Sequence, residues 1–210
     1  MNIKEIKINL ANLQAIKNNL QSSGADQSQI DCLDLMINNL QNDFEKSLKV
    51  RSNNGGIEFK GVKCKALHLR IIDTLRPAMI KLLDYGIITD SYTVMFNKDL
   101  ATITKQKIID KGVYKLDQIE NADCSQIIRG VEAISNNNPD YKLKIDSELD
   151  LHVKLSNGSY LQKQYLKTFY KYFNNIEYFT GFKEENDKPI HLFSNGKYIG
   201  IVIPDLQFNK

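Results

Sequence analysis

The stretch YLQKQYLKTFYKYF, residues 160–173, combines three evenly spaced lysines with many apolar side chains. Successive residues of an α-helix are rotated by about 100°, so residues four apart lie nearly in line. Lys163, Lys167 and Lys171 would therefore form one narrow ridge. The other side would be a broad apolar stripe suited to a protein core. It consists of Leu161, Tyr165, Leu166, Phe169, Tyr170 and Phe173. The pattern predicts a helix over residues 160–174, whose ridge is either a solvated face or a surface for a nucleic acid or an acidic partner.

The composition of the 210-residue chain is that of an ordinary globular protein, with 42% hydrophobic and 25% charged residues. This length allows one substantial domain with an appendage, or two small domains. The net charge of +3 permits contact with nucleic acid without requiring it. No signal peptide is recognised and no apolar run approaches the ~18 residues of a membrane span, so we expect a cytoplasmic protein.

The cysteine pattern indicates neither a disulfide framework nor a zinc site. Cys32, Cys64 and Cys124 are an odd number and lie far apart. Cys64 and His68 are four residues apart, as two metal ligands on one helical turn would be, but a metal ion needs more ligands than two. We therefore expect no metal and no cofactor.

The N-terminal region contains two runs in which apolar residues recur at alternating spacings of three and four. Gly24 can end the first helix and Asp26 can cap the second. Residues 2–50 are therefore predicted to form an antiparallel helical hairpin. Its apolar seams could close on each other, on the body of the protein, or on a second copy. The predicted partner or oligomer interface consists of Ile3, Ile6, Leu10, Leu13, Leu33, Ile37, Leu40 and Phe44.

A domain boundary is predicted within RSNNGG, residues 51–56, because this run is rich in turn-forming residues. It would separate the hairpin, residues 1–54, from a body over residues 55–210. The body contains short runs of β-branched and aromatic residues, which predict strands. These runs are 57–62, 85–96, 101–110, 111–116, 142–146, 149–156, 176–182, 189–193 and 197–204. Helices are expected at about 63–75, 122–135 and 160–174. The sequence thus predicts an α+β fold, with amphipathic helices packed on largely antiparallel sheet.

Sequence motifs of catalysis are absent: there is no glycine-rich phosphate loop, HExxH, GxSxG or paired CxxC. Asp90, Asp99 and Asp110 could be imagined as the metal-binding carboxylates of a nuclease. Each lies beside a turn signal, where aspartate is expected for backbone reasons. An enzyme is therefore the third hypothesis, and we expect a protein without catalytic activity.

Several segments, in order along the chain, resemble the bacterial DNA polymerase III beta-subunit sliding clamp and its shortened phage relatives. LRPAM at 75–79 and YGIITDSYTVM at 85–95 resemble a passage in which the family has an Arg-Pro pair, then a strand, then ATDGHRL. KGVYKL at 111–116 and NNPDYKLKI at 137–145 resemble the following strand and a linker. Residues 157–173 resemble a later strand and helix, and residues 188–206 resemble the closing hairpin. The resemblance covers about 130 residues and implies a DNA-clamp-like fold.

The resemblance also implies a role for the lysine ridge. Clamp helices line a central channel and present basic residues to DNA phosphates, a contact that does not read sequence. Lys163, Lys167 and Lys171 would then be the DNA-binding residues. A full clamp subunit has three domains and no N-terminal hairpin, so several copies of this chain would be needed to surround a duplex.

Two main hypotheses follow. In the first, the protein is a non-enzymatic, clamp-like accessory protein of a phage or mobile element, which self-associates, binds double-stranded DNA and tethers a partner such as a polymerase during replication. In the second, it is a protein-interaction adaptor, or an inhibitor of a host replication or defence factor, that works through the N-terminal hairpin.

Overall fold

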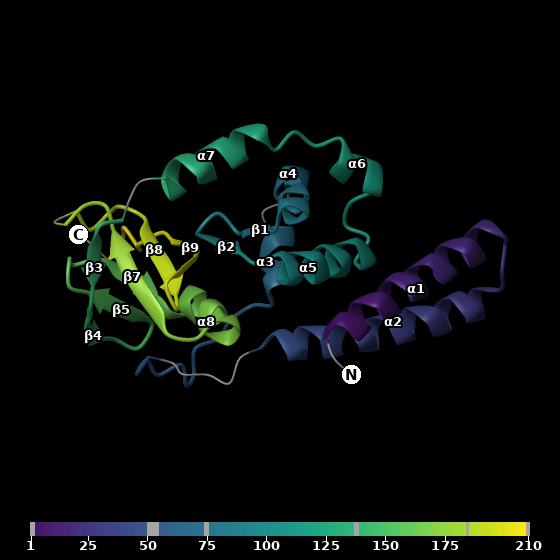
Figure 1. Ribbon diagram of the computed structural model, residues 1–210, viewed down its shortest axis with the longest axis horizontal. Helices are drawn as coiled ribbons and strands as arrows, with labels where there is room; N and C mark the ends of the chain where they lie inside the picture. Colours follow the sequence, from purple (N-terminus) through teal and green to yellow (C-terminus); the bar gives the residue numbers. More distant parts are fainter. Residues whose placement is uncertain (1–2, 50–54, 74–75, 137–138, 184, 209–210) are drawn as a thin grey trace. The chain divides into compact units, whose positions relative to one another are not determined.

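The computed structural model describes residues 3–49, 55–73, 76–136, 139–183 and 185–208 (Figure 1). The chain divides into two compact units, Met1–Lys49 and Val50–Lys210. Most of the predicted linker, residues 51–54, lies outside the described residues, as does the side chain of Ile3.

The first unit is a pair of antiparallel helices, α1 (Ile3–Ser22) and α2 (Gln27–Leu48), which lie side by side (Figure 1). Lys17 interrupts the apolar series of α1, and its ammonium group pairs with the carboxylate of Asp34 on α2 at 2.5 Å. The apolar residues that recur along the two helices are covered. Ile6, Ile30, Ile37 and Phe44 are buried, and Leu10, Leu13, Leu20, Leu33, Leu40 and Leu48 are half-buried. The predicted helical hairpin is confirmed.

The second unit contains two antiparallel sheets. The larger has the strand order β1-β2-β9-β8-β7-β3, and the smaller has the order β4-β5-β6. The strands of the larger sheet are β1 (Ile87–Thr89), β2 (Thr93–Phe96), β3 (Tyr141–Leu143), β7 (Ile176–Thr180), β8 (Ile190–Ser194) and β9 (Lys197–Val202). Those of the smaller sheet are β4 (Ile145–Glu148), β5 (His152–Leu155) and β6 (Tyr160–Gln162).

The second unit also contains helices. They are α3 (Leu67–Asp73), α4 (Pro77–Lys81), the 3-10 turn η1 (Leu82–Tyr85), α5 (Lys98–Asp110), α6 (Leu116–Glu120), α7 (Ser125–Ser135) and α8 (Lys163–Tyr172). Leu82, Ile87 and Cys124 form a buried cluster on which Ile127 and Ile128 of α7 pack. The prediction of an α+β fold with antiparallel sheet is confirmed.

Helix α8 packs directly on the larger sheet (Figure 1). The Tyr170 hydroxyl lies 2.9 Å from the Tyr178 hydroxyl of β7, and both side chains are buried. Phe169 is fully buried beside Gly200 of β9. The predicted apolar stripe of this helix therefore faces the core.

Several predictions of local structure are wrong. Residues 101–110 are helical rather than a strand. One side of this helix, with Ile103 and Ile108, is buried, and the Asn97 side chain caps α5 by accepting a hydrogen bond from the Leu100 backbone at 2.9 Å. Residues 57–62 and 111–116 form no strand. Residues 160–162 form β6 rather than the first turn of α8, because they pair with β5.

Candidate nucleic-acid interface

Lys163 does not lie on a solvated ridge. Its side chain is buried, at 4% exposed, and its ammonium group forms an ion pair with Glu148 of β4. The same Glu148 oxygen, Oε1, accepts a hydrogen bond from the Glu58 backbone at 2.8 Å. The hydrogen bond from Lys163 holds the pKa of Glu148 below the ordinary value of glutamate. The positive charge of Lys163 is therefore used inside the protein.

Lys167 is also bound within the chain. Its ammonium group donates to the carbonyl oxygen of Val62 at 2.8 Å and lies 3.4 Å from that of Phe59. The Phe59 ring contacts the ring of Tyr170, with centroids 5.6 Å apart. The segment 57–66 thus lies along α8 and covers the place where the ridge was expected to meet solvent.

The prediction of one solvated three-lysine ridge is therefore corrected. The helix and the in-line spacing are present, but seven of the ten residues of α8 are buried. Lys171 alone of the three is exposed, with its ammonium group 5.2 Å from the centroid of the Tyr172 ring. Spacing indicates which residues share a helix face, but it does not indicate which other segment covers that face.

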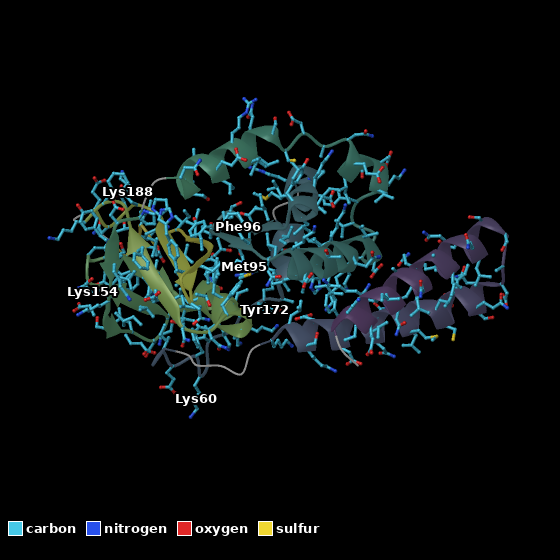
Figure 2. All side chains as sticks on the ribbon, in the orientation of Figure 1. Lys60, Met95, Phe96, Lys154, Tyr172 and Lys188 are labelled. Carbon is cyan, nitrogen blue, oxygen red and sulfur yellow. The ribbon has the colours of Figure 1, made fainter. Side chains whose placement is uncertain are left out.

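A basic cavity of about 250 Å³ lies beside the exposed end of this helix. Helix α8 contributes Lys167, Thr168, Lys171 and Tyr172. The segment before α3 contributes Cys64, Lys65 and Ala66, and α3 contributes its first residue, Leu67. Tyr172 is marked in Figure 2, near the end of α8. Three of these eight residues are lysines, so the cavity is suited to an anionic group.

Two contacts hold the wall of the cavity in place. The Lys65 ammonium group pairs with the Asp73 carboxylate at 2.6 Å, at the other end of α3. The Cys64 thiol lies 3.3 Å from the Gln164 carbonyl oxygen and 3.4 Å from the Thr168 hydroxyl. The wall and α8 therefore form one connected structure.

The segment over α8 adds lysines that helix analysis alone does not find. Lys63 is exposed and immediately precedes the cavity residues. Lys60 is exposed too and extends away from the ribbon (Figure 2), but it lines a separate depression together with Glu58 and Asp150. We use the term lysine surface for Lys63, Lys65, Lys167 and Lys171. The signal for it in the sequence is KGVKCK, residues 60–65, which has three lysines in six residues.

The three aspartates of the nuclease hypothesis have separate structural surroundings. Asp90 is buried in an ion pair with Arg70, Asp99 lies in the first turn of α5, and Asp110 accepts a hydrogen bond from Gln106 at 2.9 Å. Within the part of the chain that the structure describes, no group of three or more His, Cys, Asp or Glu side chains could hold a metal ion.

Comparisons with protein-family models, with curated proteins and with solved structures find no match to the chain. A search of the described helices finds none that is both long enough and apolar enough to cross a membrane.

Proposed function

We propose that the protein is a non-enzymatic, clamp-like accessory protein of a phage or mobile element, which holds double-stranded DNA through the lysine surface and tethers a partner such as a polymerase. The observation that carries the proposal is the position of Lys63 and Lys171. Both are exposed. Lys171 lines the cavity together with Lys65 and Lys167, and Lys63 directly precedes the cavity residues in the chain.

The chemistry of this surface suits a phosphate backbone. Duplex DNA carries one negative charge per about 1.7 Å of helix axis, and lysines that neutralise phosphates release bound counterions. Such contacts hold DNA without reading its sequence.

Part of the element order supports the clamp-like part of the proposal, although the strand that the resemblance implies at residues 111–116 is absent. The resemblance implies a strand followed by a helix at residues 157–173, and β6 and α8 lie there. It also implies a closing hairpin at residues 188–206, and β8 and β9 lie there. The packing of α8 changes the predicted contact residues, because Lys163 and Lys167 have partners within the protein. The DNA contact therefore moves to the end of α8 and to the segment beside it.

The test is charge reversal at the two exposed positions, Lys63→Glu/Lys171→Glu. Lys65 and Lys163 stay unchanged because their ammonium groups pair with Asp73 and Glu148, and Lys167 stays unchanged because it donates to the Val62 carbonyl oxygen. Binding to a labelled duplex of arbitrary sequence is measured by fluorescence anisotropy over a range of salt concentrations. We expect weaker binding and a plot of log K against log[salt] that is shallower by about 2, since two phosphate contacts are lost.

The matched control is Lys111→Glu/Lys197→Glu, which makes the same change of net charge at two exposed lysines in other parts of the second unit. We expect the control to retain most of the affinity and the wild-type salt slope. Equal losses in both variants would show that only the net charge matters. Unchanged binding by Lys63→Glu/Lys171→Glu would exclude the lysine surface as the DNA contact.

A second candidate function is an adaptor that binds another protein through the hairpin. It is favoured by two large apolar side chains that project from the hairpin, Ile8 (51% exposed) and Leu35 (62% exposed). If the protein is only an adaptor, duplex DNA will not bind to the wild type at low salt, and the anisotropy measurement separates the two functions.

A further inference from the structure

One side of the hairpin carries an open groove between its two helices. The groove has a volume of about 470 Å³. Leu13, Met36 and Leu40 line it together with Asn9, Asn12 and Asn39, and Asp43 lies with them. Ile16 follows Asn12 by four residues and so lies on the same side of α1. Ile16 is 47% exposed and Met36 is 49% exposed, so this side is both apolar and accessible.

The groove runs along one edge of the seam and shares Leu13 and Leu40 with it. Ile6, Ile30 and Ile37 fill the seam, whereas Leu13 and Leu40 are only half-buried. Two helices share a single contact line, so each helix keeps an apolar flank that a third or fourth helix normally covers. The groove is such a flank.

The charge of the groove indicates what covers it. Among the described side chains that line it, Asp43 alone is charged, and its carboxylate accepts a hydrogen bond from Lys46 at 3.1 Å. A groove without free positive charge does not suit nucleic acid. In a two-fold contact the same surface meets itself, so a strongly charged surface would repel its copy. Asparagine amides both donate and accept hydrogen bonds, so asparagines of one groove can pair with asparagines of the other.

We propose that the groove binds the same groove of a second copy of this chain, so that two hairpins form an antiparallel four-helix bundle. A helix of 20 residues is about 30 Å long, and packed helices lie about 10 Å apart. Two such helices side by side present a face about 30 Å long and about 20 Å wide, which is on the order of 600 Å² per chain. A standard interface buries about 800 Å² per chain. We therefore expect a weak dimer. This inference is independent of the proposed DNA binding.

The test is the molar mass of the full chain, measured by sedimentation equilibrium from low micromolar to about 200 μM. The wild type is expected to approach twice the monomer mass of 24.1 kDa. Ile16→Glu/Met36→Glu puts like charges on both sides of the two-fold contact and is expected to weaken the dimer at least tenfold. Circular dichroism checks that the helices remain. A wild type that stays monomeric over the whole range would overturn the proposal.

The matched control is Ala11→Glu/Asn38→Glu, which adds two negative charges at exposed positions that do not line the groove and are not three or four residues from any residue that does. This control is expected to dimerise like the wild type, and an equal loss in the control would also overturn the proposal. A mixture of Met36→Glu and Met36→Lys chains provides a second test. Each variant alone is expected to be monomeric, and the mixture is expected to form a heterodimer because the charges then attract. A mixture that remains monomeric, with both variants folded, would exclude the two-fold contact.

Discussion

The guanidinium group of Arg70 lies 3.1 Å from the carboxylate of Asp90, and both side chains are buried. Arg70 also donates to the Thr168 hydroxyl at 3.1 Å. The Asp90 carboxylate accepts hydrogen bonds from the backbone and hydroxyl of Thr93, both at 2.8 Å. This network connects α3, the β1–β2 turn and α8. Of these elements, α8 and the first residue of α3 line the basic cavity.

Removing one partner of this pair is expected to destabilise the fold strongly. Arg70→Met leaves the Asp90 charge buried without its counter-charge, which typically costs about 3–5 kcal/mol. The measurement is the free energy of unfolding from urea titration. Arg129→Met, at an exposed position on α7, is the control and is expected to change stability by less than about 0.5 kcal/mol. The double variant Arg70→Met/Asp90→Asn should be more stable than Arg70→Met alone. A smaller stability for the double variant would contradict this account of the pair.

Two glycines are expected to respond in opposite ways to the same substitution. A Cβ atom at Gly200 would lie 2.1 Å from the Val94 carbonyl oxygen and 2.9 Å from Phe169, and the φ angle is +154°. Gly200→Ala should therefore separate β9 from β2 and cost more than about 2 kcal/mol. A Cβ at Gly130, within α7, meets nothing within 4 Å.

Gly130→Ala should accordingly raise stability by about 0.5–1 kcal/mol, since alanine favours a helix and glycine does not. Thermal or urea unfolding of both variants measures the difference. Equal effects at the two positions would contradict the close approach of α8 and β2 to Gly200.

Local patterns predict those elements that depend on neighbours in sequence. The hairpin follows from its repeating seam, and β8 and β9 follow from β-branched runs on either side of an Asn-Gly turn. Residues 101–110 show the limit. Ile103 and Ile108 favour a strand by residue type, but they also share one side of a helix with Leu100 and Thr104, and packing of that side decides the structure. The Asn97 cap was the signal in the sequence.

The candidate site was only partly predictable. The spacing of Lys163, Lys167 and Lys171 places them on one side of α8, but burial of Lys163 depends on Glu148, 15 residues away. Likewise, Lys167 binds a carbonyl oxygen that lies 105 residues earlier in the chain, at Val62. Contacts between distant segments leave no periodic signal in one sequence, which is why the exposed lysines were placed incorrectly.

The Lys163 and Glu148 ion pair is expected to make stability depend on acidic pH. The pKa of Glu148 is lower in the folded protein than the ordinary value, about 4.3, mainly because of the hydrogen bond from Lys163. The stability from this group is therefore complete above pH ~4.3 and is lost as the pH falls through the lowered pKa. Lys163→Met should be less stable at pH 7 and should lose less additional stability between pH 5 and pH 3.

The control for this prediction is Lys154→Met, which removes a longer ion pair, 3.7 Å, to Asp146 in the same small sheet. Urea titrations at intervals of pH give the two acid profiles. We expect Lys154→Met to keep the wild-type slope. If Lys163→Met also keeps that slope, Glu148 does not carry the acid dependence.

Tyr165 is expected to make stability depend on alkaline pH. Its ring is stacked on that of Tyr92, with centroids 5.4 Å apart, and burial raises the pKa of its hydroxyl to about 12, with a further contribution from the negative charge of Asp90. Since the folded pKa lies above the ordinary value of about 10, the stability from this group is complete below pH ~10 and is lost as the pH rises toward 12. Tyr165→Phe keeps the ring but removes the hydroxyl, so its stability should fall less over this range, by an amount on the order of 2 kcal/mol.

Tyr85→Phe, at a position that is 59% exposed, is the matched control and should follow the wild-type curve. Unfolding free energies from pH 8 to 11.5 measure the difference, and identical alkaline curves for Tyr165→Phe and wild type would show that Tyr165 ionises freely in the folded protein.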